Sequence, residues 1–254
     1  MKARIKFRKY GVMRFIGHLD VMRYFQKAMR RAEIPIAFTG GYSPHMIMSF
    51  AQPLGVGVTS DGEYLDIELK EPIRSEEAVR QLNAVMVDGI DIVSFVQIPD
   101  DKKCSGMTIV AAAEYEVSFL ESAKSAYDTI SIGDAFTKDS DCEKLIEDFL
   151  SQDEIIVLKK SKKQEREINI KPLIYRMEAD LDNDKLHLFL AAGSEENLKP
   201  DLVMDTFFKF IGTTDTEVPV HYHRLDVYAK NPDYGKGNDR TQFVSLESLG
   251  KRHF

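Results

Sequence analysis

Two histidines near the start of the chain have the side-chain type and setting for chemistry. His45 follows Pro44 within FTGGYSPHMIMSFAQPLGVG, residues 38–57, a stretch that carries no Asp, Glu, Lys or Arg. An imidazole fixed on a turn behind a proline can act as a general acid or base, or can bind an anion. His18 lies at the start of a predicted helix. We therefore consider His45 and His18 as candidate catalytic residues.

Other interpretations of these histidines stay open. His18 falls on the apolar side of its predicted helix, which favours a packed imidazole at the helix N-terminus. A metal site made by His18, Asp20 and His45 is disfavoured, because residues two apart on a helix point about 200° apart. His221 and His223 share one face of a predicted strand, but the sequence offers no third ligand. We expect no metal site in this chain.

The helix that the pattern predicts over residues 16–33 carries cations opposite its apolar residues, within about 100° of arc. Residues 1–60 contain ten Lys and Arg against two acids, a net charge of +8, whereas the other 194 residues contain 24 and 39, a net of −15. This separation favours an anionic partner, RNA or an acidic protein, although a solvated helix face would give the same pattern. The candidate binding cations are Arg14, Arg23, Lys27, Arg30 and Arg31, and Lys2, Arg4, Lys6 and Arg8 lie on a predicted neighbouring strand.

The glycine-rich stretch adds a possible backbone site for an anion. Gly40 and Gly41 permit positive φ angles, and with Ser43 they are predicted to present free backbone N–H groups. The spacing of the glycines matches neither a Walker A loop nor a dinucleotide-binding fingerprint. We therefore expect no nucleotide cofactor.

The hydrophobic periodicity predicts an α+β fold with two tandem ferredoxin-like (βαββαβ) domains and antiparallel sheets. The predicted domains are residues 1–98, which hold the basic helix and the glycine-rich turn, and residues 107–229. Residues 99–106 form a predicted linker, and residues 230–254 a loosely packed C-terminal extension. The predicted strands are 3–9, 46–51, 63–69, 90–96, 109–119, 154–159, 173–181, 186–192 and 218–228, and the helices are 16–33, 75–87, 140–151 and 200–211.

The composition argues against a membrane protein and against a cysteine-ligated cluster in this chain. No apolar stretch approaches the length of a membrane span, so we expect no membrane partner. Cys104 and Cys142 are the only cysteines, which fits a reducing cytoplasm and leaves no C-x-x-x-C-x-x-C motif for an iron–sulfur cluster in this chain.

Three segments resemble a bacterial family of radical-SAM-linked proteins, whose defining domain has no assigned function. They are GHLDVMRYFQKAMRRAEIP, GYSPHMIMSFAQPLGVG and SDGEYLDIEL, all within residues 14–69. The sequence departs from the family pattern at Ser43–Met46, where Asn-Pro-His-Pro is more usual. The resemblance implies a radical SAM protein as partner, which would carry an iron–sulfur cluster, S-adenosylmethionine and cobalamin. It names no activity for this chain.

These observations predict a cytoplasmic, non-catalytic accessory subunit that binds tRNA or rRNA, and not DNA, for a radical SAM partner. In one alternative, His45 serves a metal-independent enzyme that cleaves or modifies RNA. In the other, the chain is a protein–protein adaptor.

Overall fold

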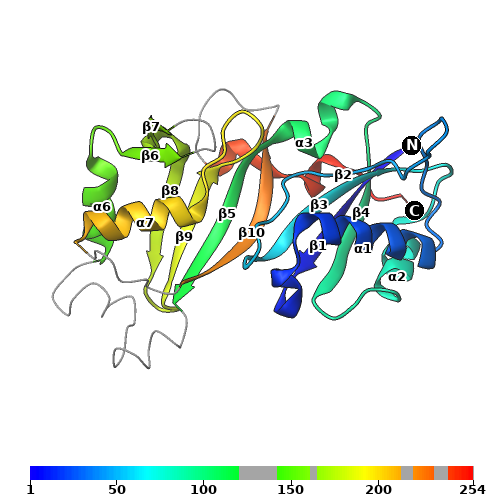
Figure 1. Cartoon of the computed structure of the whole chain (residues 1–254), viewed down its shortest axis with the longest axis horizontal. Coiled ribbons are helices and arrows are strands. Elements are labelled where there is room, and N and C mark those ends of the chain that lie inside the picture. The colour runs from blue at the N-terminus through cyan, green and yellow to red at the C-terminus, as the bar shows by residue number, and fades with distance from the viewer. Residues whose placement is uncertain (120–141, 161–164, 213–219, 232–239, 254) are drawn as a thin grey trace. The chain divides into compact units, whose positions relative to one another are not determined.

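The computed structural model describes residues 1–119, 142–160, 165–212, 220–231 and 240–253 (Figure 1). The chain divides into two compact units, one formed by Met1–Ala113 with His223–Phe254 and the other by Glu114–Tyr222. We call them the N-terminal unit and the central unit.

The N-terminal unit begins with the element order that the sequence predicts. Its first six principal elements are β1 (Lys2–Lys9), α1 (His18–Arg31), β2 (Met48–Phe50), β3 (Thr59–Glu68), α2 (Ser75–Asn83) and β4 (Ile90–Ile98). It also contains the 3-10 helices η1 (Gly11–Phe15) and η2 (Lys102–Cys104) and the short helix α3 (Gly106–Ile109). Later in the chain it contains η4 (Arg240–Gln242), β11 (Phe243–Ser245) and η5 (Glu247–Leu249).

In this unit, β1 lies between β4 and β3 and pairs with both in antiparallel fashion. β2 pairs antiparallel with β3, so Met48 lies opposite Ile67. A strand from the far end of the sequence, β10 (Val220–Lys230), pairs in parallel with the start of β3, and β11 pairs antiparallel with β10. The strand pairing is therefore mostly antiparallel.

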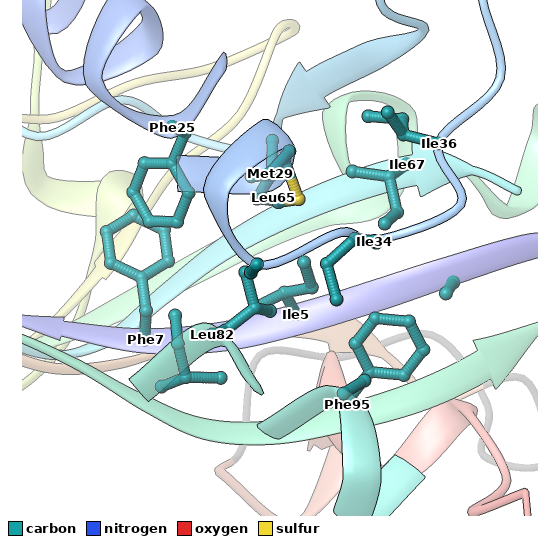
Figure 2. Close-up of a cluster of buried hydrophobic side chains, with 14 of the residues drawn as sticks. Ile5, Phe7, Phe25, Met29, Ile34, Ile36, Leu65, Ile67, Leu82 and Phe95 are labelled. Carbon is teal, nitrogen blue, oxygen red and sulfur yellow. The ribbon is translucent and has the colours of Figure 1, made fainter. Parts of the chain in front are cut away.

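One face of this sheet is covered by α1 and α2. Alternation along β1 directs Ala3, Ile5 and Phe7 into a buried cluster, where Phe25 of α1 and Leu82 of α2 meet them (Figure 2). The centroids of the Phe7 and Phe25 rings are 4.7 Å apart. The buried side of α1 thus faces the sheet, and its charged side faces solvent.

The C-terminal segment returns to the N-terminal unit. Leu246 and Phe243 are almost completely buried, and Lys251 exchanges backbone hydrogen bonds with Gln97 of β4. An added Cβ on Gly250 would lie 2.4 Å from a methyl carbon of Val96. Residues 240–253 are therefore packed, in contrast to the loose extension predicted from the Asn, Pro and Gly residues of 231–237, most of which lie outside the described residues.

The central unit, like the N-terminal unit, combines helices with antiparallel strands. Phe149 of α6 and Phe207 of α7 pack with ring centroids 5.2 Å apart. In it β9 lies between β5 and β8, β8 and β9 pair antiparallel, and β6 and β7 form a separate antiparallel pair. Its elements are β5 (Val110–Phe119, starting in the other unit), α6 (Cys142–Ser151), β6 (Ile156–Lys160), β7 (Glu165–Asn169), η3 (Lys171–Leu173), β8 (Ile174–Asp180), β9 (Lys185–Ala191) and α7 (Pro200–Phe210).

A mixed α/β architecture with mostly antiparallel pairing and few helices is thus confirmed. Among the described helices, none has both the length and the apolar character needed to cross a bilayer.

Candidate nucleic-acid interface

The outer side of α1 holds the exposed cations of the candidate interface. Arg23 donates a hydrogen bond to Asp20 at 3.1 Å, and both side chains are about two-thirds exposed. Lys27 and Arg30 are exposed and form no ion pair with any residue that the structure describes. They lie opposite the buried Phe25, because apolar residues recur at helical spacing along the inner side of α1.

Arg31 has a structural role in addition to its charge. Its Nη2 donates to the backbone oxygen of Val85 at 3.1 Å, and its guanidinium lies 6.0 Å from the ring centroid of Tyr24. The Tyr24 hydroxyl in turn accepts a hydrogen bond from the backbone N–H of Val87. Arg31 therefore connects the end of α1 to the loop after α2.

Arg14 belongs to η1, just before α1. Its guanidinium lies 4.7 Å from the ring centroid of the exposed Phe15. Its backbone oxygen accepts a hydrogen bond from Gly57 at 2.8 Å, which brings the end of the glycine-rich stretch beside η1.

His18 is the first residue of α1, and its ring is half-buried and packs edge-on against Phe50 with centroids 5.1 Å apart. It lines a small pocket together with Lys9 and Glu63. Packing at a helix start is one of the alternatives that the sequence left open for this histidine.

The pocket beside His18 contains buried charges whose pairing the sequence did not predict. Glu63 accepts a hydrogen bond from Arg224 Nε at 2.8 Å, and both residues are buried. Lys9 is also buried and donates to the backbone oxygen of Ile16 at 3.0 Å. Burial lowers the pKa of Lys9, and Arg224 lowers it further against the opposing effect of Glu63. The cluster forms because Lys9 of β1, Glu63 of β3 and Arg224 of β10 come together in the folded sheet.

His45 lies elsewhere, on an exposed turn closed by hydrogen bonds to Thr39. The backbone N–H of Thr39 donates to the oxygen of His45 at 2.9 Å, and the Thr39 hydroxyl lies 3.1 Å from His45 Nδ1. Gly40, Gly41 and Ser43 are exposed on the same turn, and Gly41 has a φ of 100°. Within the described residues no hydrogen bond joins His18 to His45.

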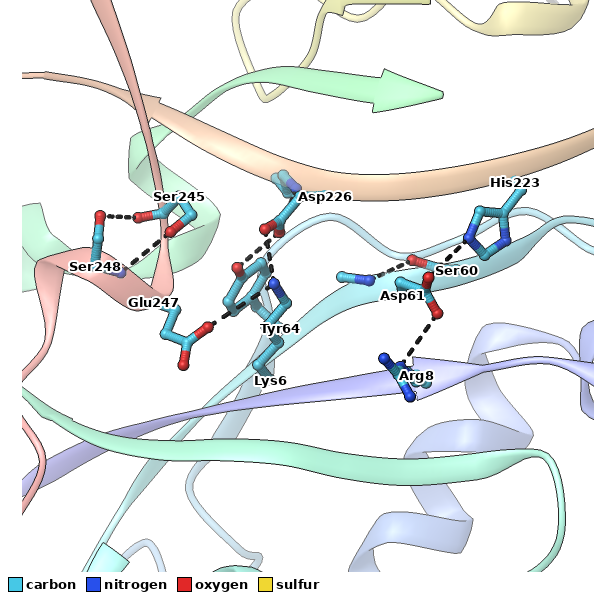
Figure 3. A network of polar contacts seen from close by, with 12 residues as sticks. Lys6, Arg8, Ser60, Asp61, Tyr64, His223, Asp226, Ser245, Glu247 and Ser248 are labelled. Carbon is cyan, nitrogen blue, oxygen red and sulfur yellow. Dashed lines mark hydrogen bonds and ion pairs between the residues drawn. The ribbon is translucent and has the colours of Figure 1, made fainter. Parts of the chain in front are cut away.

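Four cations of β1 already pair with carboxylates, so they are less available to a ligand than the sequence suggested. They lie on the sheet face away from Ile5 and Phe7 and pair with carboxylates from later segments; Figure 3 shows two of these pairs. The pairs are Lys2–Asp100 (2.8 Å), Arg4–Asp66 (2.7 Å), Lys6–Asp226 (2.7 Å) and Arg8–Asp61 (3.2 Å).

A second set of polar contacts lies at the start of β3. Thr59 Oγ1 lies 2.8 Å from His223 Nδ1. Asp61 lies 3.2 Å from His223 Nε2, as Figure 3 shows. Arg8 occupies the other side of Asp61. In the described parts of the chain, no three His, Cys, Asp or Glu side chains come together as a metal-binding group.

Residues 2–200 match the model of the family described as "Uncharacterized protein conserved in bacteria (DUF2344)". The chain belongs to this family. A search of curated proteins gave no match. The DUF2344 match includes the whole of α1 and the turn that carries His45, but its description states neither an activity nor a partner.

Proposed function

We propose that this DUF2344 protein is an accessory subunit that binds RNA through the outer side of α1. The observation that carries the proposal is the contrast between two sets of cations. Four cations of β1 pair with carboxylates, whereas Lys27 and Arg30 on α1 are exposed and form no ion pair with any described residue. Exposed cations in a row along a helix can follow the phosphates of a nucleic acid.

The proposed recipient of the RNA is a radical SAM protein, which would itself supply the iron–sulfur cluster, S-adenosylmethionine and cobalamin. The support is the resemblance of residues 14–69 to radical-SAM-linked proteins. We place the complex in the cytoplasm because this chain uses only two cysteines, too few for a disulfide framework.

We further propose that the chain is built from tandem ferredoxin-like repeats. The support is the order β1-α1-β2-β3-α2-β4 in the N-terminal unit, with β3 inserted between β1 and β2 in the pairing. In the central unit, β9 lies between β5 and β8 in the same manner.

The RNA proposal is tested by titrating labelled cellular tRNA and rRNA fragments with the purified protein at increasing salt. We expect affinity to fall steeply with salt, and the triple charge reversal of Arg23, Lys27 and Arg30 to Glu to reduce the log–log salt slope by roughly 2–3. The matched control reverses three exposed cations of the central unit, Arg166, Lys199 and Lys209. Equal weakening by both triple variants, or affinity independent of salt, would contradict a specific role for α1.

A protein–protein adaptor is distinguished by co-purification. The adaptor hypothesis expects the radical SAM partner to stay bound after nuclease treatment and at high salt. RNA binding through α1 expects instead that RNA is recovered with the wild-type chain and lost with the triple α1 variant.

A second candidate function is favoured by the contact between His45 and Thr39. That contact fixes the imidazole on an exposed turn, as an acid–base catalyst of RNA cleavage or modification would require. We expect such an enzyme to change cellular RNA with no added partner, and the His45→Ala variant to lose this activity while His253→Ala retains it. Unchanged RNA with the wild-type protein would exclude this function.

A further inference from the structure

An exposed apolar patch adjoins the basic side of α1. Val12, Phe15 and Leu19 have relative exposures of 72%, 59% and 62%, and Val56 of 63%. The hydrogen bond from Gly57 to Arg14 brings Val56 next to η1. Exposed large apolar side chains that cluster in this way mark interaction surfaces more often than isolated ones do.

The apolar residues of η1 come just before the row of cations on α1. Leu19, Arg23, Lys27 and Arg30 follow one another at spacings of four, four and three residues, so they make a single row about 16 Å long on α1. Val12 and Phe15 are three apart in η1, which places them on one face of that 3-10 helix immediately before α1. The surface is thus apolar and aromatic at one end and cationic at the other.

We infer that the RNA bound here is single-stranded and that an unpaired base stacks on Phe15 while the adjoining phosphates lie along Arg23, Lys27 and Arg30. This inference rests on the proposed function and specifies its substrate class. Phosphate contacts alone would leave the apolar end unused, whereas splayed bases offer flat apolar faces to aromatic side chains.

Duplex RNA fits this surface less well. Its bases are stacked on one another, and it presents mainly phosphates and 2′-hydroxyls to a protein. Arg14, whose guanidinium lies over Phe15, adds a planar cation that can also stack against a base.

The test compares a short labelled oligouridine with a duplex RNA of the same length, using the full chain at one salt concentration. We expect the single strand to bind more tightly. We also expect Phe15→Leu, which keeps apolar area but removes the ring, to weaken single-strand binding roughly fivefold to a hundredfold. Phe15→Tyr keeps the ring and should bind as the wild type does. The matched control is Phe210→Leu, because Phe210 is a partly exposed phenylalanine of the central unit.

The outcomes separate this inference from the function on which it rests. If duplex RNA binds as tightly as the single strand, or if Phe15→Leu binds oligouridine normally, the single-strand inference is wrong although RNA binding stands. If neither RNA binds, both fail. Loss of a co-purifying protein in Phe15→Leu with unchanged RNA affinity would assign the patch to a protein partner and also overturn the inference.

Discussion

Asp226 is a carboxylate on which several groups of the N-terminal unit converge. Its oxygens accept hydrogen bonds at 2.7 Å from Lys6 and from the Tyr64 hydroxyl, and at 2.8 Å from the backbone N–H of Val227. Burial and the negative charge of Asp226 hold the pKa of Tyr64 well above its ordinary value. Tyr64 therefore stays a hydrogen-bond donor at neutral pH, and the network ties β10 to β1 and β3.

We expect Asp226→Asn to lower the free energy of unfolding by roughly 1–3 kcal/mol, because Lys6 loses its nearer carboxylate partner in a mostly buried site and keeps only Glu247, 3.8 Å away. The measurement is urea denaturation followed by circular dichroism. Asp100→Asn is the matched control, since Asp100 also pairs with a β1 lysine but is 67% exposed, and it should cost less than about 1 kcal/mol. Similar losses in the two variants would show that Asp226 is no more important than a surface acid.

The cations of β1 show that burial and ion-pair partners of single residues cannot be predicted from the local sequence. Alternation of Arg4 with Ile5 is typical of a strand with one solvated face, yet Arg4 is only 1% exposed and is held by Asp66. Local spacing cannot predict a partner 62 residues away. On α1, by contrast, charge and helical period sufficed to predict that Lys27 and Arg30 would be exposed.

At the scale of elements, the pairing of β3 with β10 depends on a close approach at Gly62. A Cβ placed there would lie 2.6 Å from the Cα of Asp226 and 2.8 Å from the backbone oxygen of Leu225. Both are backbone atoms, so a side chain at this position would force the two strands apart.

We therefore expect Gly62→Ala to destabilise the protein by roughly 1–3 kcal/mol through overpacking. Gly40→Ala is the matched control, because an added Cβ meets no atom within 4 Å there and it should change stability little. Chemical denaturation of both variants tests this. If Gly62→Ala unfolded at the same urea concentration as Gly40→Ala, the close approach of β3 and β10 would be wrong.

The helices and strands themselves were largely predictable. The 3.6-residue period of α1 and the alternation along β1 are local signals, and both elements lie within a few residues of their predicted bounds. The parallel pairing of β10 with β3 was not predictable, because it joins segments more than 160 residues apart and no local pattern encodes it. The same reason hid the Glu63–Arg224 pair beside His18.

At the scale of the whole molecule, the charge separation along the sequence is partly cancelled by folding. Four of the ten cations in residues 1–60 pair with acids from beyond residue 60, which halves the net +8 of that segment. The exposed cations of α1 therefore account for much of the positive charge that remains in residues 1–60 after folding. A charge count along the sequence predicts an anionic partner, but only the ion pairs show which cations are left to meet it.

The C-terminal segment supplies part of the N-terminal unit's stability. Leu246 and Phe243 bury side chains that would each contribute about 1.5–3 kcal/mol, and the backbone oxygen of Leu246 accepts a hydrogen bond from Arg4. We expect a chain that ends at residue 239 to unfold at a markedly lower urea concentration and to exchange the amide hydrogens of β4 faster, because Gln97 loses its pairing with Lys251. Hydrogen–deuterium exchange with mass spectrometry measures this directly.

Leu246→Ala provides the same test in a full-length chain if the truncated protein fails to fold. It should cost about 2–5 kcal/mol, because Leu246 is fully buried, whereas Leu181→Ala in the central unit is a matched control at a position 52% exposed. Truncated and Leu246→Ala chains that keep the wild-type unfolding midpoint and the wild-type protection of β4 would show that the segment is a dispensable appendage. The expected loss would instead make residues 240–253 an integral part of the unit that presents α1, since they support β1 and β4 on the sheet against which α1 packs.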